Sequence, residues 1–129
     1  MRDKIIKLME EKSYFPKTLD ELAELLEIDK TELQEELNIL IDEYVVRETK
    51  RKKYDLLDKI NLHIGFIDIK EKGFGFIKSE NFTEEFYVSK LFIGDSMDGD
   101  KVLFSITGEN EAKGYNREAV VVEVIERKL

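Results

Sequence analysis

The stretch KGFGFIK, residues 72–78, places two phenylalanines at alternate positions, with a lysine at each end. Alternate residues of an extended strand point to the same face, so Phe74, Phe76 and Lys78 would share one side. If that side faced a core, Lys78 would be buried, and charged side chains are rarely buried without a partner. If it faced solvent, the rings would form a surface on which the bases of single-stranded nucleic acid stack. The pattern favours the stacking surface, with core packing as the alternative.

A second aromatic strand is expected in EEFYVSK, residues 84–90. Alternation puts Tyr87 and Ser89 on the face opposite to Phe86 and Val88. If Tyr87 lies beside the two phenylalanines on a neighbouring strand, three rings cover one surface and nearby lysines surround them with positive charge. Base stacking contributes about 1–3 kcal/mol per base and tolerates any base. The candidate nucleic-acid-binding residues of this region are Lys70, Lys72, Phe74, Phe76, Lys78, Tyr87 and Ser89.

Residues suited to catalysis or metal binding are scarce. The chain has no cysteine, and its one histidine, His63, lies in an alternating strand pattern that is typical of a structural or surface residue. The segment DSMDGD, residues 95–100, puts Met97 and Gly99 where an EF-hand loop needs oxygen ligands, so a tight turn explains it better. GFGFIK lacks the third glycine of a dinucleotide-binding loop. We therefore expect no catalytic residue, metal site or cofactor in this chain.

Charge is distributed unevenly along the 129 residues, whose net charge is −8. Residues 1–43 carry 6 Lys/Arg against 13 Asp/Glu, residues 44–59 carry 6 against 3, and residues 60–129 carry 9 against 13. A basic segment therefore separates two acidic ones. The charged start, MRDKIIKLMEEK, excludes a secretory signal, and no apolar run is long enough to span a membrane. We expect a cytoplasmic monomer with no membrane partner.

The first third of the chain is predicted to be helical. In RDKIIKLMEEK, residues 2–12, apolar residues recur on one helical face. TLDE, residues 18–21, has the form of a capping box, in which the Thr18 hydroxyl and the Glu21 carboxylate each accept a backbone N–H. A third helix is expected to begin at Asp29 or Thr31 and to run to Tyr44, because its leucines keep helical spacing.

A hairpin with a basic tip is expected after these helices. Two β-prone runs, residues 44–48 and 53–57, flank the tip, and three helices followed by a hairpin is the order of a winged helix. The third helix carries acidic residues and no Lys or Arg between Thr31 and Val46, which disfavours insertion into a DNA groove. The tip either contacts a phosphate backbone or is a soluble turn. Its candidate binding residues are Lys50, Arg51, Lys52 and Lys53.

From residue 60 onward the pattern changes to short strands. Five are expected, within residues 60–70, 74–80, 84–90, 101–107 and 117–127, separated by turn signals that include GENEAKGYN, residues 108–116. Five short strands in so short a segment predict a small closed barrel of the OB type. The predicted fold is therefore α+β, with a winged helix over residues 1–59 and a five-stranded OB-fold barrel over residues 60–129.

The barrel segment also resembles a known family. KGFGFI and EFYVS are similar to the two RNA-binding signatures of the cold-shock domain. The longer strings GFIDIKEKGFGFI, EFYVSKLFIGDSMDGDKV and NREAVVVEVIER resemble the first cold-shock domain of the ribonuclease R family of RNB exoribonucleases, which often carry a winged helix ahead of it. The resemblance covers nearly the whole chain.

The resemblance implies a function. The family degrades RNA from the 3′ end, using magnesium held in a central catalytic domain that this sequence does not contain. The chain would be the N-terminal fragment of such an enzyme, which captures single-stranded RNA and guides it to that domain, and it would need no cofactor itself. By the same resemblance Phe74, Phe76 and Tyr87 match stacking residues, and Lys72 matches the basic residue before the glycine.

The chain departs from the cold-shock pattern at two positions. Ser89 stands where a histidine is usual, and Ile67 or Ile69 stands where a tryptophan is usual, which implies weaker RNA binding. Two other functions stay open, namely a separate cold-shock-type RNA chaperone and a winged-helix DNA-binding regulator. The partner of the winged helix also stays open between structured RNA and a protein.

Overall fold

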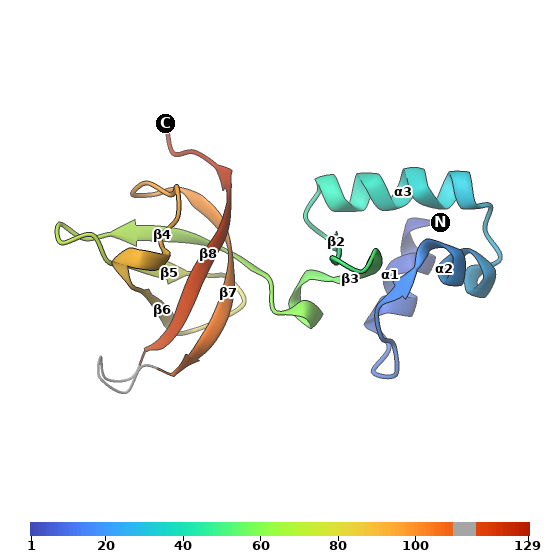
Figure 1. The fold of residues 1–129 in the computed structure, drawn as a ribbon, viewed down its shortest axis with the longest axis horizontal. Helices are drawn as coiled ribbons and strands as arrows, with labels where there is room; N and C mark the ends of the chain where they lie inside the picture. Colours follow the sequence, from blue (N-terminus) through green and yellow to red (C-terminus); the bar gives the residue numbers. More distant parts are fainter. Residues whose placement is uncertain (110–115) are drawn as a thin grey trace. The chain divides into compact units, whose positions relative to one another are not determined.

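The computed structural model describes residues 1–109 and 116–129 and contains two compact units, Met1–Ile60 and Asn61–Leu129 (Figure 1). The first unit holds three α-helices and a small sheet, and the second holds a five-stranded barrel. The fold is therefore α+β, as the sequence predicts. Most of the turn expected in GENEAKGYN, namely residues 110–115, lies outside the described residues.

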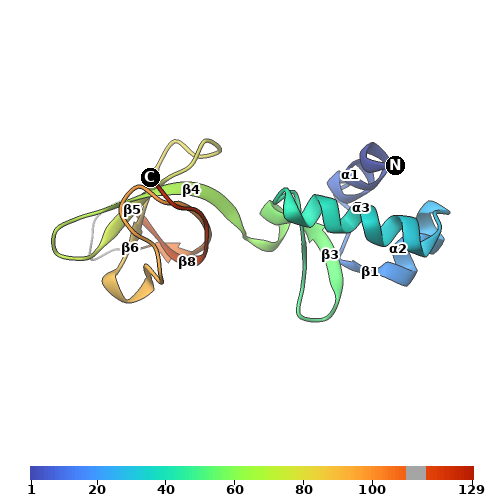
Figure 2. The same ribbon diagram turned by 90° about the horizontal axis from the view of Figure 1, so that it is seen from above.

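The first unit consists of three helices and a three-stranded antiparallel sheet. Strand β3 is central and pairs with β1 on one side and β2 on the other. In Figure 2 the β2–β3 hairpin extends away from α3. The elements are α1 (Arg2–Glu10), β1 (Lys17–Thr18), α2 (Leu19–Leu26), α3 (Lys30–Asp42), β2 (Val46–Glu48) and β3 (Lys53–Leu56).

Local signals at the helix starts form as predicted. The Thr18 hydroxyl accepts a hydrogen bond from the Glu21 amide at 3.2 Å, and the Glu21 carboxylate accepts one from the Thr18 amide at 2.9 Å. The capping box is thus confirmed. Asp29 caps α3 in the same manner, because its carboxylate accepts from the amides of Thr31 and Glu32. The apolar faces of the three helices bury Ile5, Met9, Leu22, Leu26, Leu33, Leu37 and Leu40.

Three expectations for this unit were wrong in detail. Helix α1 ends at Glu10 instead of residue 12, and α3 ends at Asp42, because Tyr44 has a left-handed backbone with φ of 59°. Neither helix nor strand therefore includes Tyr44. Strand β1 was not expected at all, since two residues carry no periodic pattern. It forms because Lys17 and Thr18 pair with residues of β3, a contact between distant parts of the chain.

The second unit is a closed barrel with strand order β4-β5-β6-β8-β7. Neighbouring strands are antiparallel except β6 and β8, which pair in parallel at Tyr87 and Glu118. The predicted five-stranded barrel is thus confirmed, with each strand inside or close to its expected range. The strands are β4 (His63–Ile69), β5 (Gly75–Lys78), β6 (Glu85–Val88), β7 (Lys101–Glu109) and β8 (Arg117–Glu126).

Alternating residues of these strands fill the barrel. Buried side chains from all five strands form one core cluster, with Phe86 and Phe104 as its largest members. Gly65 allows a close approach, because a Cβ atom there would lie 2.6 Å from the Lys78 carbonyl oxygen. The core residues are Ile67, Ile77, Phe86, Val88, Val102, Phe104 and Ala119.

Two short 3-10 helices were not expected from the sequence. One covers Leu57–Ile60, so β3 ends one residue earlier than predicted, and the other covers Lys90–Phe92. The second follows β6 directly and bends the chain away from the barrel strand. Short segments of this kind have no repeating pattern long enough to be recognised.

No helix in the described parts of the chain combines the length and the apolar character that crossing a bilayer requires.

Candidate nucleic-acid interface

Three aromatic rings form a cluster on the barrel surface. The ring centroids of Phe74 and Phe76 lie 5.9 Å apart, and the Tyr87 ring lies 5.8 Å from each of them. The Phe74 and Tyr87 planes are inclined by 34°, while Phe76 meets both other rings edge-on. We call these three residues the aromatic cluster. Such spacings are typical of favourable aromatic contacts.

The pairing of β5 with β6 positions this cluster. Phe76 is directly opposite Tyr87 in the antiparallel register, so their side chains project from the same face of the sheet. Their sequence neighbours Ile77 and Phe86 point the other way and are fully buried in the barrel core. None of the three clustered rings belongs to that core. The aromatic cluster therefore lies on the outer face, and the core-packing alternative for Phe74 and Phe76 is excluded.

The rings are not equally accessible. Phe74 and Phe76 are half-buried, whereas only 8% of Tyr87 is exposed. Tyr87 thus forms the floor between the two phenylalanines, and stacking on its full face would require them to move. The accessible ring surface belongs mainly to Phe74 and Phe76.

The lysines predicted to surround the cluster differ in whether they form ion pairs with nearby carboxylates. Lys70 pairs with Asp68 at 2.8 Å, and its amine lies 6.0 Å from the centroid of the Phe76 ring. Lys78 lies opposite Glu85 across the strands, with 3.8 Å between the charged atoms. For Lys72, in the β4–β5 turn, the structure records no ion pair to any described residue.

The ion pair between Lys70 and Asp68 shifts the pKa of both side chains. The hydrogen bond from Lys70 holds the pKa of the Asp68 carboxyl below its usual range. The same bond raises the pKa of the Lys70 amine. Both side chains are exposed, so we expect the pair to open when a phosphate competes for Lys70.

The turn between β4 and β5 is tight and holds Lys72 beside the cluster. The Lys70 amide donates to the Phe74 carbonyl at 2.8 Å, and the Gly73 amide donates to the Lys70 carbonyl at 2.9 Å. Gly73 has φ of 99°, a conformation that favours glycine. This turn directs the chain from β4 into the first ring of the cluster.

Two further residues of this surface were missed by sequence reasoning. Lys90 is exposed and packs against the turn, since a Cβ atom on Gly73 would lie 2.9 Å from its Cδ atom. Phe66 is 53% exposed on β4 and is paired with Lys78 in the register. Alternation along β4 could have found Phe66. Ser89, which the sequence did include, is half-buried and precedes the Lys90–Phe92 helix.

The two isoleucines considered as replacements for a surface tryptophan do not face the cluster. Ile67 is 1% exposed in the barrel core, and Ile69 packs against that core. Neither isoleucine therefore stands at an outward-facing position of β4 where a stacking tryptophan would be replaced. The residues that alternate with them, Phe66 and Asp68, are the exposed ones on β4. The outer face of this strand thus offers one aromatic ring and one carboxylate.

The basic hairpin tip belongs to the other unit. Lys50, Arg51 and Lys52 lie in the loop between β2 and β3, and Lys53 begins β3. Thr49 closes this loop, because its amide donates to the Lys53 carbonyl at 2.7 Å and its carbonyl accepts from the Lys52 amide. The structure therefore places these four residues together in the first unit.

The other candidate residues have structural roles. His63 contacts the rings of Phe82 and Phe104 and lies 3.0 Å from the Asn61 side-chain oxygen. In the DSMDGD segment Asp100 is 1% exposed and accepts from the Met97 amide, as expected of a tight turn. Among residues 1–109 and 116–129 no group of three His, Cys, Asp or Glu residues could hold a metal ion.

Comparison with known proteins agrees with this barrel geometry. Residues 65–124 match the family model described as the ribonuclease B OB domain. Over the barrel, the chain is therefore similar to the OB region of the ribonuclease B family. The chain is also 29% identical to ribonuclease R of Ureaplasma parvum serovar 3 over 109 residues, which is 81% of this chain. That match is longer than the barrel, so it extends into the helical unit, and the chain spans 15% of that relative's length.

The match to the ribonuclease B OB domain confirms, for the OB region, the resemblance seen in the sequence. The match runs from Gly65 to Val124 and so includes the aromatic cluster and the turn that carries Lys72. The winged-helix and cold-shock assignments stay predictions.

Proposed function

We propose that this chain is the leading RNA-binding part of a ribonuclease R-like 3′–5′ exoribonuclease, and that it captures single-stranded RNA on the outer face of β4, β5 and β6. The observation that carries the proposal is the aromatic cluster, which lies outside the core on the OB domain of a ribonuclease family. Solvent-facing rings on an OB barrel are suited to unpaired bases, because every base has a flat face.

In this proposal the accessible phenylalanines hold the bases. One base stacks on Phe74 and the next on Phe76, while Tyr87 supports both rings from below. Lys72 and Lys78 contact the phosphates, and Lys70 joins them when it leaves Asp68. Ser89 and Lys90 border the path of the strand after β6. Recognition of this kind is independent of base sequence, as a nuclease that degrades many RNAs requires.

Hydrolysis itself is assigned to a catalytic domain outside these residues, where magnesium would be bound. The fragment then serves to capture RNA and to guide it to that domain. The helical unit, residues 1–59, is proposed to be a winged helix. The exposed surface of α3 carries Glu32, Glu35 and Asp42. This charge disfavours the alternative of a DNA-binding regulator, because phosphates would repel such a helix.

Oligonucleotide binding tests the proposal. Fluorescence anisotropy with a labelled 12-nucleotide oligouridylate is compared for the wild type, for Phe74→Ala with Phe76→Ala, and for Val122→Ala. Val122 is an exposed apolar residue on β8 and serves as the matched control. We expect the double variant to bind at least ten-fold more weakly and the control to bind like the wild type, because each lost stack removes about 1–3 kcal/mol.

Thermal melts of the same proteins separate binding from folding. The double variant should melt within a few degrees of the wild type, because neither ring belongs to the core cluster. Unchanged RNA affinity with an unchanged melt would overturn the proposal. Raising the salt concentration should weaken binding, and salt-independent binding would contradict the lysine contacts.

A further inference from the structure

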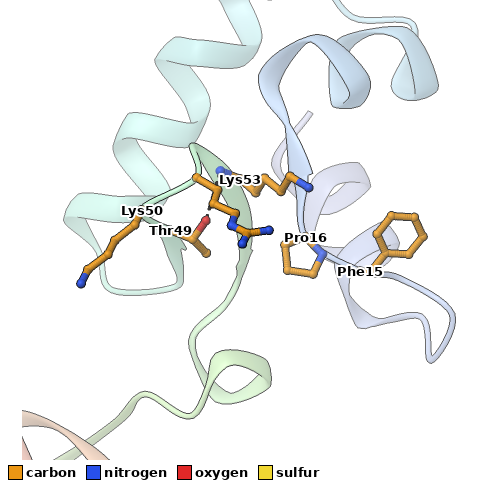
Figure 3. Close-up of a pocket in the computed structure, with 6 residues that line it drawn as sticks. Phe15, Pro16, Thr49, Lys50 and Lys53 are labelled. Atoms are coloured by element: carbon orange, nitrogen blue, oxygen red, sulfur yellow. Dashed lines mark hydrogen bonds between the residues drawn. The ribbon is translucent and has the colours of Figure 1, made fainter.

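The helical unit carries a second pocket that combines an exposed aromatic ring with positive charge. It has a volume of about 440 Å³ and lies where the segment after α1 meets the β2–β3 hairpin. Figure 3 shows Phe15 and Pro16 on the first of these segments, and Thr49, Lys50 and Lys53 on the hairpin. The residues that line it are Phe15, Pro16, Thr49, Lys50, Arg51 and Lys53.

Strand β1 brings the two sides of this pocket together. Lys17 and Thr18 pair with Tyr54 and Lys53 of β3, which fixes the residues just before β1 beside the hairpin. Tyr14 adds a second anchor, because its buried hydroxyl donates to the Tyr54 carbonyl at 2.6 Å. Since Tyr14 points into the unit, the next residue is directed outward. Phe15 is therefore held at the surface by packing and hydrogen bonds around it.

Phe15 has an unusually exposed side chain for a large aromatic residue. It is 60% exposed, although the Lys17 amine lies 3.5 Å from the centroid of its ring. One face of the ring thus carries a cation, and much of the remaining ring is in solvent. A single exposed aromatic residue is common on protein surfaces. Here it borders a pocket lined by a proline and by basic side chains, which is not a general property of surfaces.

The charge around the pocket selects for an anion. Lys50, Arg51 and Lys53 line it, and the structure records no ion pair for their side chains within Met1–Ile60. Glu21 lies close enough to Lys53 and Lys17 for both to lower its pKa, although hydrogen bonds from Thr18 have the larger effect. The residues that line the pocket include three cations and no carboxylate, so the lining itself is positively charged.

We propose that Phe15 and Pro16, with Arg51 and Lys53 of the hairpin, form a second nucleotide site that holds one unpaired RNA base and its phosphate. A flat apolar ring and a guanidinium suit a planar base, and Arg and Lys side chains suit the adjoining phosphate. The base must be unpaired, because the faces of a base in a duplex are covered by its neighbours. The site lies on a different unit from the aromatic cluster, so its occupancy does not depend on the barrel.

NMR titration of the complete 129-residue chain tests this site. The probe is a 5′-phosphorylated tetrauridylate, and an abasic ribose-phosphate tetramer is the comparison ligand. We expect the amide signals of Phe15, Thr49 and Arg51 to shift on titration with tetrauridylate. The abasic tetramer should bind there roughly ten-fold more weakly, because it offers phosphates without a base to stack.

Matched variants identify the groups involved. Phe15→Ala should abolish most of the shifts at Thr49 and Arg51, whereas Ile39→Ala, at a similarly exposed apolar residue of α3, should leave them unchanged. Arg51→Gln should weaken binding at this site, while Lys7→Gln, which removes the same charge from α1, should not. The melting temperatures of all four variants are measured to establish that each is folded.

The barrel variant keeps the two proposals distinguishable. In Phe74→Ala with Phe76→Ala, the shifts at Phe15 should persist while those on β5 and β6 disappear. The second site is overturned if the amide shifts of Phe15, Thr49 and Arg51 vanish in that variant. It is also overturned if they never occur while amide signals of the barrel do shift, and in that case the barrel proposal stands. If only amide signals of the helical unit shift on titration, the barrel proposal fails instead. Equal shifts with tetraglutamate would also overturn the nucleotide site in favour of an acidic protein partner.

Discussion

The rings of Phe76 and Tyr87 lie 5.8 Å apart across the β5–β6 pair, on the face of the sheet opposite to the barrel core. Phe86, the residue before Tyr87, lies on the inner face with its ring 5.2 Å from that of Phe104. Consecutive aromatic residues thus serve different environments. This division means that binding and stability can be changed separately in the same two strands.

The first prediction concerns stability. Phe86→Ala should lower the free energy of unfolding by about 3–5 kcal/mol, because it removes a fully buried ring and leaves a cavity. Phe76→Ala should cost much less, since its ring is half-buried on the outer face. Urea denaturation followed by circular dichroism measures both. Equal losses for the two variants would show that Phe76 supports the barrel as Phe86 does.

The second prediction concerns the ion pair beside the aromatic cluster. Asp68→Asn should strengthen RNA binding by roughly two- to five-fold at low salt, because it releases Lys70 and removes one negative charge near the phosphates. The advantage should shrink as salt is added. Asp95→Asn is the control with the same change in net charge. Weaker binding by Asp68→Asn would mean instead that the carboxylate positions Lys70 for its phosphate contact.

The third prediction concerns acid stability of the barrel. The Asp100 carboxylate accepts hydrogen bonds from the Lys128 amide at 2.9 Å and the Met97 amide at 2.8 Å, and it pairs with Arg127. These contacts, the Lys128 bond first, hold the pKa of Asp100 below its usual range. A lowered folded-state pKa means that the stabilisation is present above the unfolded value of about 3.9 and is lost as pH falls through the folded value.

Asp100→Asn should therefore melt at a lower temperature than the wild type at pH 7. The difference should begin to diminish below about pH 4, where the unfolded carboxyl takes up a proton, and should be smallest once the folded carboxyl is protonated as well. Thermal melts at pH 7, 4 and 2.5 provide the measurement. A difference that is constant across this range would show that the charge of Asp100 contributes nothing beyond its hydrogen bonds.

The fourth prediction has the opposite sign and concerns the helical unit. Burial raises the pKa of Asp55. This effect outweighs the hydrogen bond that its carboxylate accepts from the Leu56 amide at 2.8 Å, which lowers the pKa. A raised folded-state pKa means that ionisation opposes folding, so stability is lost as pH rises through that value. Asp55→Asn should therefore raise the melting temperature at pH 7 and change it little at pH 3. A destabilised variant at pH 7 would show that the ionised carboxylate is favourable in its site.

Several features could be read from local patterns. The capping box at Thr18, the three helices and the five barrel strands are each predicted by residue types and spacings within a few positions of one another. The opposite facing of Ile77 and Phe76 follows from strand alternation alone. Strand β1 could not be read in this way, because it depends on pairing with the distant strand β3. The position of Phe66 beside Lys78 could not be read either, because it depends on the register between β4 and β5.

The order of residues alone specified which of them could stack, pair and cap, because residue type and spacing decide local backbone geometry. It also determined the barrel, whose strand lengths and alternation leave few other ways to bury the apolar faces. Three-dimensional packing was needed to show that Tyr87 is the nearly buried floor of the aromatic cluster, and that Lys70 is paired with Asp68. It was also needed to show that Phe15 and Lys53 line one pocket, since the register between strands distant in sequence arises from packing the whole unit.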